Sequence, residues 1–269
     1  MTALELDGVS RDFTTPDGRG YRALDDVSLS IPAGSFVAIV GPSGCGKSTL
    51  LNIVAGLLTP STGRVRVDGE ELAGLNRRAT YMFQQDALLP WKTVRENVAL
   101  GLTLGGVAKP DAQTRADAWL ARVGLAAFAS HYPSQLSGGM RKRVVMAQNW
   151  ILDRSILLMD EPFSALDVHT RQQMESELLA LWEEKTLNKT IVFVTHDLEE
   201  AIALADEVVV LSAGPAAHIV ARHTVTLDRP RDLMELRTAP AFVDLYRAIW
   251  AVLRQEVVKS QQPVELRRG

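Results

Sequence analysis

The sequence predicts an α/β fold built on a mainly parallel β-sheet, with a helical subdomain inserted into it. Continuous apolar runs recur along the chain and are separated by helical patterns, as in sheets of parallel strands joined by helices. A complete glycine-rich phosphate-binding loop follows one of these runs and leads into a helical pattern. By contrast, the stretch from about residue 86 to residue 153 contains no convincing strand.

Apolar patterns locate the individual strands. Residues 4–9 and 63–69 alternate between apolar and polar side chains, which is typical of half-buried strands. Four other segments are nearly continuous apolar runs, which indicate strands that are covered on both faces. These segments are SFVAIV at 35–40, SILLMD at 155–160, TIVFVTH at 190–196 and EVVVLS at 207–212.

Helices are expected between and after these strands. KSTLLNIVAGLL at 47–58 predicts a helix after the glycine-rich loop, and Asp111 is expected to cap a helix over AQTRADAWLARVG. Two stripes at helical spacing mark further helices, namely Met140, Val144, Ala147 and Ile151, and in the tail at 232–257 Phe242, Leu245, Ile249 and Leu253. We therefore expect a main domain over 1–230, with the helical subdomain at about 86–153, and a helical tail over 231–269.

Composition limits the class of protein. The 269 residues are 46% hydrophobic and 23% charged, with a net charge of −3, as in an ordinary globular chain without an electrostatic preference for nucleic acid. The single cysteine, Cys45, cannot form an internal disulfide, which suits a reducing compartment. No signal-peptide pattern and no apolar run of about 18–20 residues is visible, so we do not expect the chain to cross a bilayer by itself.

Residues 41–48, GPSGCGKS, match the pattern G-x-x-x-x-G-K-[ST] completely. Small residues let backbone N–H groups point at phosphate oxygens, and the helix N-terminus adds a positive partial charge. Lys47 can neutralise β- and γ-phosphate charge, Ser48 can ligate Mg²⁺, and Cys45 is interpreted as a small space-filler rather than a redox switch. The expected nucleotide-binding residues are Gly41, Pro42, Ser43, Gly44, Cys45, Gly46, Lys47, Ser48 and Thr49.

Two later strand ends carry candidate catalytic side chains. In SILLMDE, Asp160 can reach Mg²⁺, and Glu161 can orient or deprotonate an attacking water. The alternative is an acidic strand end that merely precedes a turn at Pro162. His196 ends TIVFVTH and can stabilise charge that develops near the γ-phosphate. An ordinary solvated histidine is the alternative there.

In chain order, GPSGCGKST, FQQDALLPW, LSGGM, LLMDEP, SALD and VTHD resemble the motifs of ATP-binding-cassette (ABC) ATPases, over roughly residues 4–230. The LLPW segment and LSGGM further resemble import ATPases of the nitrate/sulfonate/taurine type. This resemblance implies a P-loop core with a mainly parallel sheet, an antiparallel β region and the inserted helical subdomain. It also implies hydrolysis of Mg-ATP in a head-to-tail dimer of two copies.

The resemblance gives roles to residues outside the P-loop. Ser137, Gly138 and Gly139 of LSGGM would bind the ATP that the partner's P-loop holds. Gln84 would contact Mg²⁺ and water, because the family's spacing to the proline, here Pro90, selects it over Gln85.

Phe13 lies where the family places the aromatic ring that stacks on adenine. Tyr21 is the alternative, because TTPDGRGY at 14–21 resembles an inserted turn. Asp167 of SALD would contact the partner subunit near the two ATP sites.

The resemblance also implies two membrane permease subunits and, indirectly, an extracytoplasmic solute-binding protein, with this chain at the cytoplasmic face of the membrane. Nitrate, sulfonate or taurine would be typical solutes. An export ATPase and an ABC ATPase acting on DNA or ribosomes are the rival interpretations. Trp91 is either ordinary packing or part of a permease groove at 86–98. The segment MRKRVVMAQNWI departs from the family pattern at Lys142, Gln148 and Asn149.

Overall fold

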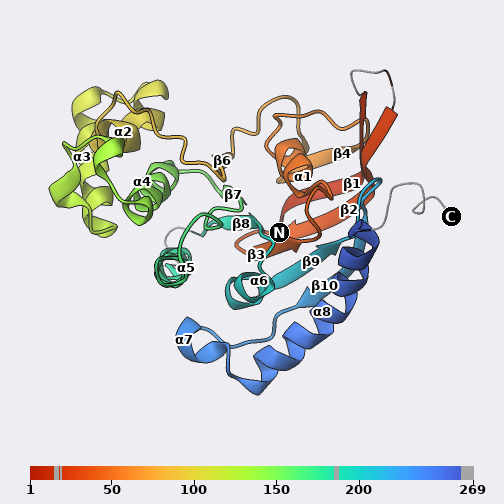
Figure 1. Ribbon diagram of the computed structural model, residues 1–269. Coiled ribbons are helices and arrows are strands. Elements are labelled where there is room, and N and C mark those ends of the chain that lie inside the picture. Colours follow the sequence, from red (N-terminus) through yellow and green to blue (C-terminus); the bar gives the residue numbers. More distant parts are fainter. Residues whose placement is uncertain (15–17, 19, 185–187, 262–269) are drawn as a thin grey trace.

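The computed structural model describes residues 1–14, 18, 20–184 and 188–261, and two β-sheets form its centre (Figure 1). The larger sheet has the strand order β10-β9-β3-β8-β7-β6, and the smaller, antiparallel sheet has the order β2-β1-β4-β5. The larger sheet consists of β3 (Phe36–Val40), β6 (Ala79–Met82), β7 (Ile156–Asp160), β8 (Thr190–Val194), β9 (Glu207–Leu211) and β10 (Ile219–Thr224). The smaller sheet consists of β1 (Thr2–Thr14), β2 (Gly20–Pro32), β4 (Thr62–Val67) and β5 (Glu70–Glu71).

The larger sheet confirms the predicted α/β fold with a mainly parallel sheet. The four continuous apolar runs form β3, β7, β8 and β9, which pair in parallel, and only β10 is antiparallel to its neighbour. β8 ends at Val194, so the predicted strand at 190–196 is two residues too long and His196 lies beyond it. β8 lies between β3 and β7, and the ends of these strands therefore meet at one edge of the sheet.

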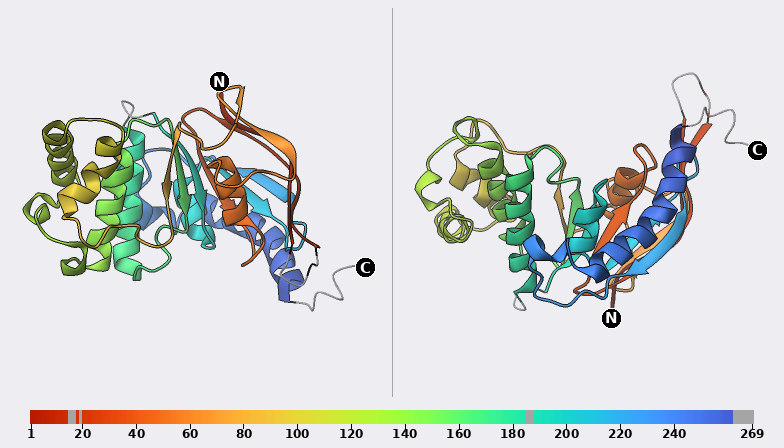
Figure 2. Two further views of the ribbon diagram at one scale, coloured as in Figure 1. Left: turned by 90° about the horizontal axis from the view of Figure 1, so that it is seen from above. Right: turned by 60° about the horizontal axis from the view of Figure 1, so that its bottom comes forward.

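Both faces of the larger sheet are covered (Figure 2). Phe36, Ala38 and Val40 of β3 pack on one face with α5 (Val168–Glu183), α6 (Leu198–Leu204) and the C-terminal helix α8 (Pro240–Gln261). Val37 and Ile39 face the opposite way, toward α1 (Lys47–Val54) and the smaller sheet. Burial on both faces explains why these strands are continuous apolar runs rather than alternating patterns.

The helices between β6 and β7 lie to one side of the sheets and have a core of their own (Figure 1). They are α2 (Val94–Leu104), α3 (Lys109–Arg122) and α4 (Gly138–Trp150), with short 3-10 turns at Ala126–Phe128 and Pro133–Gln135. On α4, Val144 and Ala147 are fully buried in this core and Met140 packs against it, while Ile151, the C-cap of the helix, is 2% exposed. The predicted apolar stripe of this helix is therefore confirmed.

Two predicted helix boundaries are wrong. Asp111 does not cap α3, because the helix begins at Lys109 with Ala108 as its N-cap. Pro110 is tolerated in the first turn, because N–H groups there have no intrahelical acceptor. The carboxylate of Asp111 lies near the positive end of the helix dipole. α1 ends at Val54 rather than at residue 58, because Gly56 has a φ of +70° and turns the chain back.

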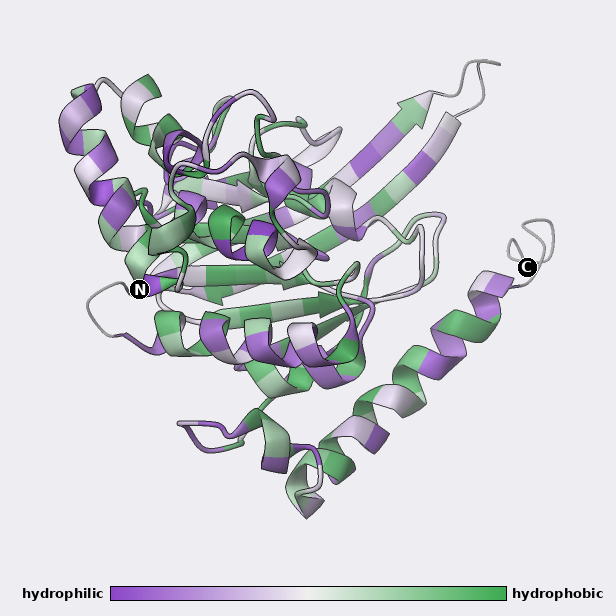
Figure 3. Cartoon of the chain, turned by 60° about the vertical axis from the view of Figure 1, so that its left-hand side comes forward, coloured by the Kyte–Doolittle hydropathy of each residue, from purple (hydrophilic) through white to green (hydrophobic). Residues whose placement is uncertain are grey.

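The C-terminal segment forms α7 (Leu233–Leu236) and α8. Phe242, Ile249 and Leu253 are at most 5% exposed. Figure 3 shows that hydrophobic and hydrophilic residues alternate along α8. This confirms the predicted stripe, although α8 continues to Gln261. In the described part of the chain, no helix is both long enough and apolar enough to span a membrane. The division of the chain at residue 230 stays a prediction.

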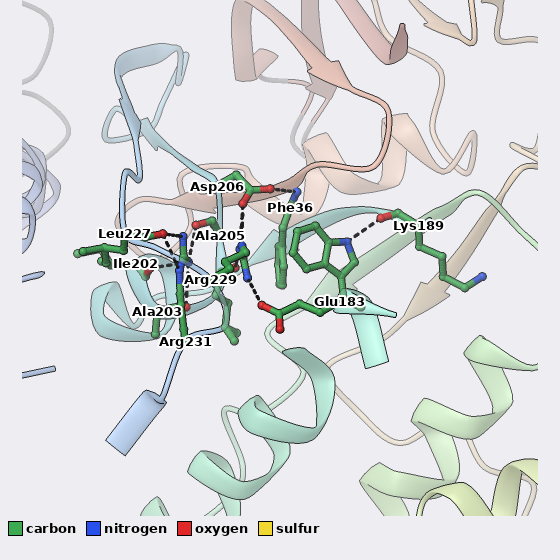
Figure 4. A network of polar contacts seen from close by, with 12 residues as sticks. Phe36, Glu183, Lys189, Ile202, Ala203, Ala205, Asp206, Leu227, Arg229 and Arg231 are labelled. Atoms are coloured by element: carbon green, nitrogen blue, oxygen red, sulfur yellow. Dashed lines mark hydrogen bonds and ion pairs between the residues drawn. The ribbon is translucent and has the colours of Figure 1, made fainter. Parts of the chain in front are cut away.

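Two arginines attach the start of this segment to the end of α6 and to neighbouring residues (Figure 4). Arg231, which is 8% exposed, donates to the carbonyl oxygens of Ile202, Ala203 and Ala205 at the end of α6. Arg229 pairs with Asp206 at 2.9 Å, while its guanidinium lies 4.5 Å from the centre of the Trp182 ring. Carbonyl groups at a helix C-terminus have no intrahelical donors, so Arg231 satisfies groups that would otherwise be buried without a partner.

Replacing Arg231 with methionine is expected to lower the free energy of unfolding by about 2–3 kcal/mol, because buried carbonyl groups lose their donor. Thermal unfolding would measure the change. Arg222→Met is the matched control, since Arg222 lies on β10 and pairs with Glu207 while 43% of its side chain stays exposed. Such a pair contributes under about 1 kcal/mol. Equal losses in the two variants would contradict this role of Arg231.

Candidate active site

The glycine-rich loop connects β3 to α1, as its sequence context predicts. Gly46 is the N-cap of α1 and has a φ of 102°, in the left-handed region that favours glycine. A Cβ atom added to Gly41 would lie 2.8 Å from the Sγ atom of Cys45, so the loop closes tightly on itself. Lys47 is 5% exposed, and its Nζ atom donates to Gly41 O at 2.9 Å and to Pro42 O at 3.0 Å. The cation is therefore held within the loop.

Cys45 is 1% exposed and forms no disulfide. Burial raises the pKa of its thiol, which keeps the sulfur protonated and unreactive at neutral pH. These properties agree with the interpretation of Cys45 as a space-filling residue.

Asp160, the last residue of β7, lies beside the start of α1. Ser48 Oγ donates to Asp160 Oδ1 at 3.0 Å, and Tyr81 OH donates to Asp160 Oδ2 at 3.3 Å. Burial raises the pKa of the Asp160 carboxyl, and the hydrogen bonds from Ser48 and Tyr81 act against this shift. The hydroxyl of Ser48 and the carboxylate of Asp160 are hard oxygen donors of the kind that Mg²⁺ prefers, so these two residues fit that metal.

Glu161 and His196 meet at the neighbouring strand ends. Glu161 Oε2 lies 2.9 Å from His196 Nδ1, and the amide of Glu161 donates to Val194 O at 2.9 Å. Glu161 has a φ of 43°, a left-handed conformation that a non-glycine residue rarely adopts. The side chain of Glu161 is 21% exposed and that of His196 53% exposed.

Two cavities adjoin the P-loop. One, of about 300 Å³, is lined by Phe13, Tyr21, Ala23, Ser43, Gly44, Gly46, Lys47, Ser48, Thr49 and Glu161. The other, of about 930 Å³, reaches from Tyr21, residues 41–44 and His196 to α8. Phe13 and Tyr21 are paired across the β1–β2 hairpin, so both rings border the smaller cavity. Residues 15–17 and 19 of the predicted inserted turn lie outside the described residues.

The other predicted site residues lie elsewhere. Gln84 lies on the loop that follows β6 (residues 83–93, called the Q-loop below), and its Nε2 atom donates to Ser164 Oγ at 3.4 Å rather than to Ser48 or Asp160. Ser137 caps α4 by accepting a hydrogen bond from Met140 N at 3.3 Å. Neither Gln84 nor residues 137–139 line the two P-loop cavities.

Comparison with known proteins decides the family. The family model for ABC transporters matches residues 24–164. The chain belongs to this family. The taurine import ATP-binding protein of Rhizobium johnstonii is 43% identical to this chain, over 93% of this chain and 96% of that protein. An uncharacterized ABC transporter ATP-binding protein of Methanocaldococcus jannaschii is 43% identical over 96% of this chain and 93% of that protein.

Two further similarities extend this result. The nitrate import ATP-binding protein of Synechococcus elongatus is 40% identical over 94% of this chain and 38% of that protein. Among solved structures, a dimeric post-hydrolysis ATP-binding cassette bound to ADP and Pi has a TM-score of 0.72 and 34% identity, covering 84% of this chain and 100% of that one. The ABC protein described here is accordingly an ATPase, and Mg²⁺ is the typical metal of such enzymes.

Three polar contacts of this ABC protein were missed in the sequence analysis. Tyr81 holds Asp160 but lies on β6, a four-residue strand that the apolar patterns did not identify. Ser164 links Gln84 to Glu161, because its Oγ donates to Glu161 O at 3.0 Å. Lys142 was noticed only as an unusual residue, whereas its Nζ atom donates to Gln84 O at 2.9 Å.

Proposed function

We propose that this chain is the ATP-hydrolysing subunit of an ABC importer, and that it works as a head-to-tail dimer of two copies. Each P-loop would hold Mg-ATP against the signature segment (LSGGM, residues 136–140) of the other copy. The dimer would then drive two separate membrane permease subunits from the cytoplasmic face of the membrane. A solute-binding protein on the other side would deliver the solute.

The incomplete P-loop site is the observation that carries this proposal. One chain supplies Lys47, Ser48, Asp160, Glu161 and His196 to the site, whereas its signature segment lies outside both P-loop cavities. Ser137 is exposed at the N-terminus of α4, where free N–H groups and the helix dipole favour an anion. A second copy can bring this anion-binding turn to the open side of the P-loop. The similar solved cassette that is bound to ADP and Pi is dimeric, which supports a dimer of two copies.

The proposed roles follow the geometry of the site. The P-loop amides and Lys47 would bind the phosphates, while Ser48 and Asp160 would hold Mg²⁺, which neutralises charge on the phosphate oxygens. Glu161 Oε2 would accept the proton of the attacking water, and His196 would donate toward the γ-phosphate.

Gln84 would join the metal site only after its side chain leaves Ser164. Asp167, the N-cap of α5, would contact the partner copy.

The helical subdomain is the proposed docking surface for a permease. Trp91 is 71% exposed, which disfavours an ordinary packing role. A groove of about 390 Å³ lies nearby in sequence and is lined by Lys92, Glu96, Ala99, Thr103, Val107, Lys109 and Gln113. An exposed aromatic ring that precedes a groove-lining residue, here Lys92, is suited to a protein partner. The taurine- and nitrate-import relatives support a small anionic solute, with sulfonates as the related third class.

Reconstitution tests the importer assignment. The chain would be co-purified with the permease proteins encoded beside its gene and placed in liposomes with the neighbouring solute-binding protein. Uptake of labelled taurine, nitrate and an alkyl sulfonate would then be measured with and without ATP. ATP-dependent uptake of one of them is the expected result. Export from the vesicles, or hydrolysis stimulated by DNA or ribosomes without membrane association, would overturn the assignment.

Phe13→Ala is expected to weaken ATP and ADP binding to a similar extent, because stacking on adenine does not involve the γ-phosphate. A ring–base contact contributes about 1–3 kcal/mol, which corresponds to roughly a 5- to 150-fold change in Kd. The Arg11 guanidinium already stacks on this ring, 4.7 Å from its centre, so the ring can present a face to a planar group. Calorimetry with both nucleotides measures the effect. Tyr21→Ala is the matched control, and a larger loss there would assign the adenine to Tyr21.

A further inference from the structure

The side chain of Lys142 is unusually placed for a lysine. It projects from the second turn of α4 and is only 4% exposed. Burial of an ammonium group is costly unless polar partners surround it. Lys142 also lies in the segment MRKRVVMAQNWI, where the sequence departs from the motif pattern that it otherwise resembles.

The partners of Lys142 both lie on the Q-loop. Its Nζ atom donates to Gln84 O at 2.9 Å and forms an ion pair with Asp86 Oδ1 at 2.8 Å. The second oxygen of Asp86 accepts from Arg141 Nε at 3.2 Å. Arg141 in turn donates to Leu136 O at 2.8 Å, at the start of the signature segment. Lys142 and Arg141 thus fasten the Q-loop to the end of α4 that carries Ser137.

The same loop is connected to the catalytic strand end. Gln84 Nε2 donates to Ser164 Oγ, and Ser164 Oγ donates to Glu161 O. A continuous set of contacts therefore runs from Glu161 through Gln84 to Lys142. If Gln84 moves when ATP occupies the P-loop, the hydrogen bond from Lys142 to its backbone carbonyl would shift the N-terminal end of α4 in the same direction.

We propose that Lys142 is a positioning residue that couples the two ATP sites of the dimer. Gln84 serves the site in its own subunit, whereas the signature segment serves the site in the partner. A rigid link between them makes the occupation of one site favour the closure of the other. This inference rests on the head-to-tail dimer proposed above.

Four variants separate the contacts. Lys142→Met replaces the lysine by a side chain of similar length that can make neither contact. Lys142→Gln keeps a donor for Gln84 O but loses the charge that pairs with Asp86. Asp86→Asn removes the charge that pairs with Lys142 and with Arg141 but leaves the hydrogen bond from Lys142 to Gln84 O. The Lys142→Met/Asp86→Asn double variant completes a double-mutant cycle. Arg143→Met is the matched control, because Arg143 lies on the same helix and pairs with Glu177 at 2.5 Å without contacting the Q-loop.

Three measurements are made on each variant. They are ATP affinity at protein concentrations too low for dimers, the Hill coefficient and kcat of hydrolysis, and ATP-driven dimerisation with Glu161→Gln added. Lys142→Met is expected to leave the monomer affinity unchanged, to lower the Hill coefficient toward 1, and to weaken dimerisation about 3- to 30-fold. Lys142→Gln and Asp86→Asn should have smaller effects, and the double variant should resemble Lys142→Met. Arg143→Met should lower only the melting temperature.

The outcomes distinguish the two proposals. If Glu161→Gln with Lys142 intact stays monomeric with ATP, the head-to-tail dimer fails and the coupling role fails with it. If that protein dimerises and the Lys142→Met form dimerises equally well with an unchanged Hill coefficient, only the coupling role is wrong. If Lys142→Met and Arg143→Met reduce dimerisation equally, Lys142 is merely structural. If the Lys142→Met protein does not fold, Lys142→Gln and Asp86→Asn provide the test instead. An unchanged Hill coefficient in both of these variants would also refute the coupling role of Lys142.

Discussion

Glu161→Gln is expected to abolish steady-state ATP hydrolysis while leaving ATP binding intact. The amide has nearly the same shape as the carboxylate and can still bond to His196, which lies 2.9 Å away. It cannot, however, accept a proton from water. Loss of a positioned base typically lowers the rate by about 10²–10⁴, which corresponds to roughly 3–5 kcal/mol in the barrier.

The variant should also accumulate as an ATP-bound dimer, because reopening would follow hydrolysis. Phosphate release would be measured beside equilibrium ATP binding and size-exclusion chromatography with light scattering. Glu184→Gln makes the same chemical change at a residue that pairs with Arg122 and is 45% exposed, and it should leave all three measurements unchanged. Near-normal turnover of Glu161→Gln would remove this residue from the proposed role.

Strands that are buried on both faces were predictable because nearly all of their residues are apolar, whichever face each residue points to. Phe36 and Val37 are both fully buried, although they point into different cores, so β3 is visible as one apolar run. Two of the strands that were missed carry no such signal. β10 (Ile219–Thr224) lies at the sheet edge and is partly exposed along its length, and β6 has only four residues. Their assignment depends on pairing with distant strands, which local patterns do not contain.

The candidate site was predictable where a motif fixes local geometry. Lys47 and Ser48 follow directly from the loop–helix junction, and Asp160 and Glu161 follow from a strand end. Gln84 was assigned by resemblance to the metal site, whereas the structure places its side chain on Ser164. The contacts of Tyr81 and Lys142 join elements that lie far apart along the chain. Such contacts depend on how β6, β7 and α4 pack, and spacing alone does not reveal them.

The head-to-tail arrangement makes the most discriminating prediction, which concerns two defective subunits that restore one site together. Lys47→Ala removes the cation held among the P-loop carbonyls. Ser137→Arg places a bulky side chain at the exposed N-cap of α4, where a small hydroxyl is proposed to meet the γ-phosphate. Each homodimer should have two defective sites, because every composite site needs one sound Lys47 and one sound Ser137.

A heterodimer of the two variants separates the possible arrangements. If the sites are composite, one site combines both lesions and the other combines an intact Lys47 with an intact Ser137. That heterodimer should trap about one ATP, since a single complete site closes on one nucleotide. If each subunit used its own Ser137 instead, both sites would carry one lesion and neither would be restored. The described positions favour the first arrangement, because Ser137 does not line the P-loop cavities of its own chain.

The two variants would carry different affinity tags, with Glu161→Gln added to both so that bound ATP is not hydrolysed. Doubly tagged dimers would be purified in sequence, and trapped nucleotide would be counted per dimer. Trapping is a better readout than transport, because transport can require two working sites. The two homodimers and a heterodimer with intact Lys47 and Ser137 in both subunits set the lower and upper limits. Trapping no higher than in the homodimers would exclude the head-to-tail arrangement for this chain, since the folded intact heterodimer shows that nucleotide can be retained.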